Sequence, residues 1–100
     1  MMEHLIKTIR NRKNSQIDKS YTKQLTSAGL EKCINKLEEE FDELKEALLS
    51  KKSNVVHETA DVIYHLLVSL EVANIRFEDV LKELDKRSTQ SGIDEKKNRK

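Results

Sequence analysis

The sequence has no proline, no tryptophan, two glycines and a single cysteine among its 100 residues. Long stretches therefore lack the residues that interrupt helices, while 37% of the residues are charged. This composition predicts an all-α protein. Cys33 has no partner for an internal disulfide, which suits a reducing compartment.

Long hydrophobic runs and a strong net charge are also missing. No segment approaches the ~20 apolar residues of a membrane span, and the N-terminus lacks the apolar core of a signal peptide. The 19 basic and 18 acidic residues leave a net charge of +1, which gives no field that would attract nucleic acid or an acidic membrane. We expect a cytoplasmic protein without nucleic-acid or membrane partners.

Apolar residues recur at steps of three and four along most of the chain. This spacing predicts four main helices, over about 2–12, 30–49, 55–73 and 77–87, and a short helical turn ending at Ala28. A small helical bundle over residues 1–88 is therefore expected. Residues 89–100 contain Ile93 as their one apolar side chain and are predicted to form a charged, disordered tail.

The predicted helix over 55–73 is apolar on nearly every side from Val62 to Ala73. A helix that is apolar all round must be buried all round, and three other helices offer little surface to cover it. We therefore expect the bundle to be completed by homodimerisation. A monomer with one locally apolar helix is the alternative.

Two helices carry pairs of carboxylates at helical spacing. Glu40 and Glu43 lie about 60° apart beside the apolar stripe of the helix over 30–49, and Glu58 and Asp61 have the same spacing on the next helix. Helices joined by a short connection are antiparallel neighbours, so four carboxylates can converge. All-oxygen ligands suit Mg²⁺ or Mn²⁺ rather than zinc. The open alternative is a solvated face with local ion pairs.

Three other side chains in this region have ordinary structural explanations. His65 follows Asp61 by one turn and is interpreted as a core histidine with satisfied nitrogens rather than a ligand. Tyr64 is expected to pack in the core, and Cys33 to act as a small hydrophobic residue.

Three blocks of the sequence together resemble a known family. The run Glu39-Glu40-x-x-Glu43, followed by Glu58-x-x-Asp61, resembles the EExxE…ExxD signature of the MazG-like nucleotide pyrophosphohydrolases, which are all-α. Within that group the flanking segments resemble the phosphoribosyl-ATP pyrophosphohydrolases of histidine biosynthesis. The quoted segments are SYTKQLTSAGLEK (20–32), NKLEEEFDE (35–43) and ETADVIYHLLVSL (58–70). One departure is Glu38, which stands where the family usually has glycine.

The resemblance implies an activity and a set of roles. The activity is hydrolysis of phosphoribosyl-ATP to phosphoribosyl-AMP and pyrophosphate by metal-activated water, with Mg²⁺ or Mn²⁺, in a helical homodimer. The implied metal ligands are Glu40, Glu43, Glu58 and Asp61, and the implied catalytic residues are Glu39 and Glu40. Glu39 would be an additional ligand or the group that orients the attacking water. The implied substrate-binding residues are Ser20, Tyr21, Thr22, Lys32 and Lys36.

Two alternatives to this activity remain. A house-cleaning MazG-like pyrophosphatase would act on noncanonical or deoxynucleoside triphosphates. A non-catalytic helical dimerisation module would leave the acidic pairs solvated.

Overall fold

The computed structural model describes residues 2–16, 20–50 and 54–89, which contain five α-helices. They are α1 (Met2–Asn14), α2 (Tyr21–Ala28), α3 (Leu30–Ser50), α4 (Val55–Val72) and α5 (Phe77–Ser88). These ranges contain no strand, so the all-α prediction is confirmed. The predicted disordered tail falls almost wholly on residues 90–100, which lie outside the described ranges.

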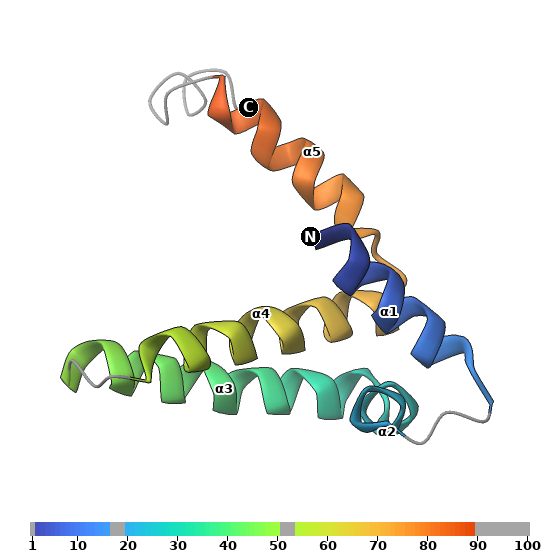
Figure 1. Cartoon of the computed structure of the whole chain (residues 1–100), viewed down its shortest axis with the longest axis horizontal. Helices are drawn as coiled ribbons and strands as arrows, with labels where there is room; N and C mark the ends of the chain where they lie inside the picture. Colours follow the sequence, from blue (N-terminus) through green and yellow to red (C-terminus); the bar gives the residue numbers. More distant parts are fainter. Residues whose placement is uncertain (1, 17–19, 51–53, 90–100) are drawn as a thin grey trace.

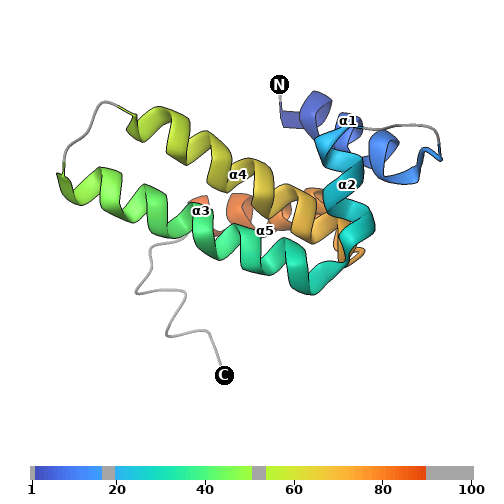
Figure 2. The same ribbon diagram turned by 90° about the horizontal axis from the view of Figure 1, so that it is seen from below.

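The centre of the fold is an antiparallel hairpin of α3 and α4, the two longest helices (Figure 1). The short α2 lies across the end of this hairpin where α3 begins and α4 ends (Figure 2). α1 crosses the same end of α4, and α5 points away from the hairpin (Figure 1). None of the described helices is long and apolar enough to cross a membrane.

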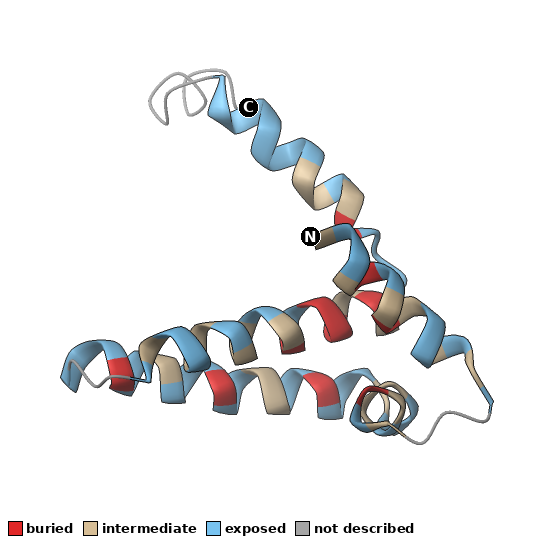
Figure 3. Cartoon of the chain, viewed as in Figure 1, coloured by how far each residue is buried: buried red, intermediate tan, exposed pale blue. Residues whose placement is uncertain are grey.

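The hydrophobic core lies where α1 and α2 meet the hairpin, as the buried segments in Figure 3 indicate. Its fully buried residues come from four helices: Ile6, Ile9, Cys33, Leu67, Val68 and Phe77. Burial of one such aliphatic side chain stabilises the fold by about 1.5–3 kcal/mol. Cys33 is 1% exposed, which confirms its reading as a small core residue.

Ion pairs fix α1 against the α4–α5 junction. The Arg10 guanidinium donates to Glu71 at 2.6 Å and to both carboxylate oxygens of Glu78 at 2.7 and 2.9 Å. Arg10 thereby lowers the pKa of Glu78 to about 2. Between the two helices Asn74 adopts φ 60°, a left-handed conformation that asparagine tolerates well. The direction of α5 therefore depends on this turn and on the Arg10 contacts.

One side of the hairpin remains uncovered within a single chain. Three apolar residues of α3, Ile34, Phe41 and Leu48, are 42%, 57% and 57% exposed. On α4, Ile63 and Leu66 are each 38% exposed. Burial on all sides of α4 is therefore not achieved within one chain. The ribbon of α5 points away from the hairpin (Figure 1).

Candidate functional site

Three carboxylates from the two hairpin helices meet at one place. Glu40 and Glu43 lie on the same face of α3 because they are three residues apart, and Glu58 lies in the first turn of the antiparallel α4. One oxygen from each lies within 4.8 Å of the others. Three of the four predicted metal ligands are thus brought together.

The buried oxygens of this carboxylate cluster (Glu40, Glu43 and Glu58) lack partners. Among the described residues, the Oε2 atoms of Glu40 and Glu58 are buried and have no hydrogen bond. Removing an anionic oxygen from water without a partner is costly. Burial raises the pKa of Glu58, and the neighbouring Glu43 carboxylate adds to the rise. The cluster is therefore an arrangement of hard oxygen donors that a divalent cation would stabilise.

The other carboxylate oxygens of Glu40 and Glu58 are held by neighbouring side chains. Oε1 of Glu58 accepts a hydrogen bond from the Asn54 side-chain amide at 3.0 Å. Oε1 of Glu40 lies 3.5 Å from the Lys36 ammonium. Each carboxylate therefore has one oxygen fixed by the protein and one oxygen left for a ligand. Asn54 is the N-cap residue of α4, but its side chain makes no capping hydrogen bond to the helix backbone. The side-chain amide donates to the Glu58 carboxylate instead.

A small pocket opens beside the cluster. Its volume is about 110 Å³, and it is lined by Glu43, Glu46, Ala47, Asn54 and Glu58. Ala47 is 2% exposed, and its small side chain leaves room between the acidic groups. The pocket gives the carboxylate cluster access to the surface.

The remaining predicted acidic residues lie differently. Asp61 is absent from the close group, and its carboxylate lies 3.2 Å from His57 Nε2 on the same helix. Glu39 is 66% exposed in its side chain and accepts a hydrogen bond from Lys36 at 3.2 Å. Lys36 thus bridges Glu39 and Glu40, whereas Lys32 is exposed on the first turns of α3.

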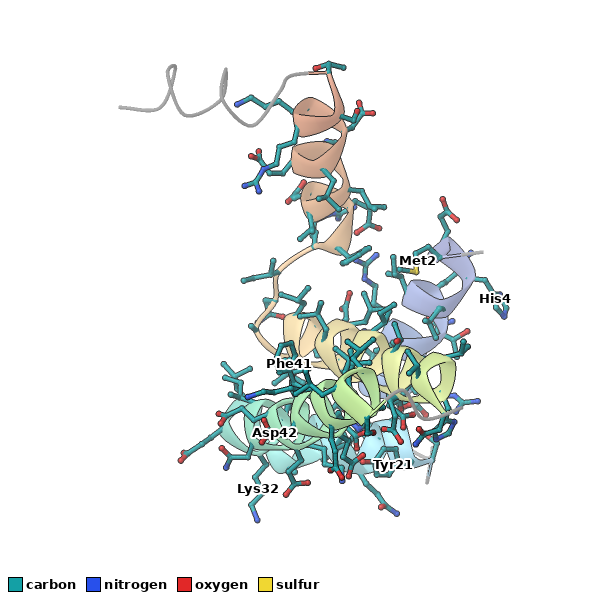
Figure 4. The ribbon with its side chains drawn as sticks, turned by 90° about the vertical axis from the view of Figure 1, so that its left-hand side faces the viewer. Met2, His4, Tyr21, Lys32, Phe41 and Asp42 are labelled. Atoms are coloured by element: carbon teal, nitrogen blue, oxygen red, sulfur yellow. The ribbon has the colours of Figure 1, made fainter. Side chains whose placement is uncertain are left out.

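The predicted substrate-binding residues of α2 are docked on α4. Ser20 caps α2 by accepting a hydrogen bond from the Lys23 backbone at 3.2 Å. The Tyr21 hydroxyl lies 3.2 Å from His65 Nε2, and the Thr22 hydroxyl bonds that of Tyr64. In the view along the hairpin in Figure 4, Tyr21 lies on a different side of it from Phe41 and Asp42.

His65 and Tyr64, the α4 residues that contact Tyr21 and Thr22, were not predicted from the sequence to be functional residues. His65 is 6% exposed with both ring nitrogens bonded, so its reading as a satisfied core histidine is confirmed. Its partner, however, is a half-exposed tyrosine of the SYT block rather than another core group. One signal in the sequence could have suggested this contact with α2. Tyr64 and His65 are adjacent, and each can form a hydrogen bond.

The fold and the site together define the class: an all-α protein with a carboxylate cluster between two antiparallel helices. The family described as "Phosphoribosyl-ATP pyrophosphohydrolase" matches residues 2–88. Proteins named "Phosphoribosyl-ATP pyrophosphatase" are similar over most of their length. One from Allorhizobium ampelinum is 42% identical, with 82% of this chain and 80% of the relative covered. One from Roseobacter denitrificans is 41% identical, with 98% and 94% covered. One from Paracoccus denitrificans is 39% identical, with 99% and 93% covered.

The chain belongs to the phosphoribosyl-ATP pyrophosphohydrolase family, as the match over residues 2–88 and these identities establish. The family named from the three sequence blocks is thereby confirmed.

Proposed function

We propose that this protein hydrolyses phosphoribosyl-ATP to phosphoribosyl-AMP and pyrophosphate, the second step of histidine biosynthesis. Family membership and the names of the relatives support the substrate. The observation that carries the proposed chemistry is the convergence of Glu40, Glu43 and Glu58 with two buried, unpartnered oxygens. A dimerisation module would have no need for such a group.

The ion we propose for the carboxylate cluster is Mg²⁺, with Mn²⁺ as a substitute. Glu40, Glu43 and Glu58 would hold it, with Asp61 as a further ligand from the next turn of α4. When bound, such an ion polarises phosphoryl oxygens, lowers the pKa of water and stabilises a pyrophosphate leaving group. This sequence has no glycine-rich loop that could bind the phosphates through backbone N–H groups. We therefore propose that the metal ion provides most of the phosphate binding.

Residues around the carboxylate cluster would bind and orient the substrate. Lys36 lies 3.5 Å from Glu40 and would place a positive charge at the phosphate chain, with the exposed Lys32 one turn away as a second contact. Glu39 or Glu40 would accept a hydrogen bond from the attacking water and orient it. Ser20, Tyr21 and Thr22 would bind the substrate from α2.

We also propose that a second copy of the chain covers the open side of the hairpin. Apolar residues of both helices line a groove of about 390 Å³, with Glu38 and Asp42 beside them: Ile34, Leu37, Phe41, Val62 and Leu66. An apolar surface of this kind on the two longest helices is typical of an interface between subunits. Glu38 lines this groove, so the usual glycine is replaced on the proposed interface rather than in the carboxylate cluster.

The experiment that tests the function is an assay of pyrophosphate release with purified protein. Phosphoribosyl-ATP is compared with a panel of canonical and noncanonical deoxynucleoside triphosphates, each with Mg²⁺ and with a chelator. We expect metal-dependent turnover of phosphoribosyl-ATP with phosphoribosyl-AMP as the second product. Turnover of the deoxynucleoside triphosphates alone would identify a house-cleaning pyrophosphatase. No turnover of any substrate would favour a non-catalytic module.

A further inference from the structure

Two consecutive residues of α2 pair with two consecutive residues of α4. Tyr21 bonds His65, and Thr22 bonds Tyr64. The ring of Tyr21 is stacked on that of Tyr64, with centroids 6.3 Å apart and 19° between the planes, and meets His65 edge-on at 5.9 Å. An isolated helix of eight residues is unstable in water. The position of α2 therefore depends on contacts such as these.

The hydrogen bonds of His65 define the direction of the contact with Tyr21. His65 Nδ1 lies 2.8 Å from the backbone oxygen of Asp61, which can only accept a hydrogen bond. Nδ1 therefore carries the proton, and in the neutral ring Nε2 is an acceptor. It follows that the Tyr21 hydroxyl donates to Nε2 across 3.2 Å. The imidazole is thus fixed at one nitrogen and holds Tyr21 with the other.

Tyr21 lies between this buried anchor and the solvent beside the carboxylate cluster. Tyr21 remains half-exposed, at 48% for the whole residue. Burial raises the pKa of the Tyr21 phenol, Lys36 opposes the rise, and Tyr64, Glu40 and Asp61 add to it. The charged groups of α3 and α4 that flank the cluster therefore act on the same phenol. Tyr21 is therefore a partly exposed aromatic residue within electrostatic reach of Glu40 and Lys36.

We propose that His65 is a positioning residue: it holds the Tyr21 hydroxyl so that the exposed part of the ring faces a nucleotide whose phosphates lie at the carboxylate cluster. This inference rests on the proposed function, which places Tyr21 among the substrate-binding residues. His65 does not contact the substrate and acts only through Tyr21. Replacing His65 should weaken substrate binding and leave the carboxylate cluster intact.

The direct test is a set of variants assayed with phosphoribosyl-ATP. His65→Phe keeps a buried ring but removes the acceptor, and Tyr21→Phe removes the donor. Loss of one such hydrogen bond should raise KM roughly three- to tenfold in each, with kcat within about twofold of the wild type. The double variant should be no worse than either single variant, because both changes break the same contact.

Conservative replacements separate positioning from packing. His65→Gln can bring an amide oxygen to the place of Nε2 and should restore most of the wild-type KM, whereas the shorter His65→Asn should not. Ser69→Ala is the matched control, since Ser69 is buried on α4 and its side-chain hydroxyl donates to the backbone oxygen of His65 at 2.9 Å. This control should keep the wild-type KM.

Several outcomes would overturn the inference. They are a wild-type KM in His65→Phe, additive effects in the double variant, or equal impairment of His65→Gln and His65→Asn. Should His65→Phe fail to fold by circular dichroism, Tyr21→Phe decides, because it removes a single hydroxyl from a half-exposed residue. Failure of the wild type itself to hydrolyse phosphoribosyl-ATP would instead refute the proposed function. The two failures are therefore distinguishable.

Discussion

Removing one charge from the carboxylate cluster should make the variant more stable than the wild type without metal and less stable than the wild type with Mg²⁺. Glu43→Gln is the suitable change because Glu43 is exposed, so the isosteric amide disturbs little packing. Glu40 and Glu43 present oxygens within 4.8 Å of one another. At that separation two like charges repel by about 1 kcal/mol in a water-like dielectric and by about 3.5 kcal/mol at an effective dielectric constant of 20. We use the lower repulsion energy because Glu43 is exposed to water.

Without metal, Glu43→Gln should therefore be more stable than the wild type by about 1 kcal/mol, a rise in Tm of about 4–8 °C for a domain of this size. With free Mg²⁺ a hundredfold above its Kd, the wild type should gain about 2.7 kcal/mol. The variant lacks one anionic ligand and should gain far less. The wild type then becomes the more stable protein.

The assay is thermal unfolding in chelator and in a series of Mg²⁺ concentrations. One protein concentration is used throughout, because self-association would make the Tm depend on it. Asp85→Asn, an exposed carboxylate on α5, is the control and should follow the wild type in both conditions. Equal Mg²⁺-induced shifts in the wild type and Glu43→Gln would refute the reasoning. So would a metal-free variant that is less stable than the wild type.

Three further predictions concern the core, the ion pairs and the open groove. Ile9→Ala, at a residue 1% exposed, should lower the free energy of unfolding by about 2–5 kcal/mol, measured by urea denaturation. Because Arg10 lowers the pKa of Glu78 from 4.5 to about 2, the pair stabilises the fold above pH 4.5 and its contribution is lost as the pH falls towards 2. The difference in Tm between wild type and Glu78→Gln should shrink over that range, and a constant difference would contradict this. Phe41→Asp in the groove should convert a dimer to a monomer by light scattering, while Leu49→Asp, 76% exposed outside the groove, should not.

The helices and much of the carboxylate cluster could be predicted from the sequence because both depend on local spacing. Apolar steps of three and four define helices wherever breakers are absent, and α1 merely continues two residues beyond the predicted end. Glu40 and Glu43 share a face for the same local reason, and the short connection to α4 makes Glu58 their neighbour. These inferences required no knowledge of how other elements pack.

The rest depended on contacts between distant parts of the chain. Asp61 has the same spacing from Glu58 as Glu43 has from Glu40, yet its carboxylate pairs with His57. Helical spacing determines the face of the helix on which a side chain lies, but not the neighbouring group with which it interacts. His65 meets Tyr21, 44 residues earlier, only because α2 crosses the hairpin end. The exposure of Ile63 and Leu66 likewise depends on how the other helices pack, which local spacing does not give.

The most direct test of the central claim is the anomalous diffraction of Mn²⁺ in crystals of the protein grown with pyrophosphate. We predict Mn²⁺ within coordination distance of carboxylate oxygens of Glu40, Glu43 and Glu58, with pyrophosphate bound to the ion and facing Lys36. Well-occupied Mn²⁺ elsewhere, with the three glutamates coordinating no ion, would contradict it.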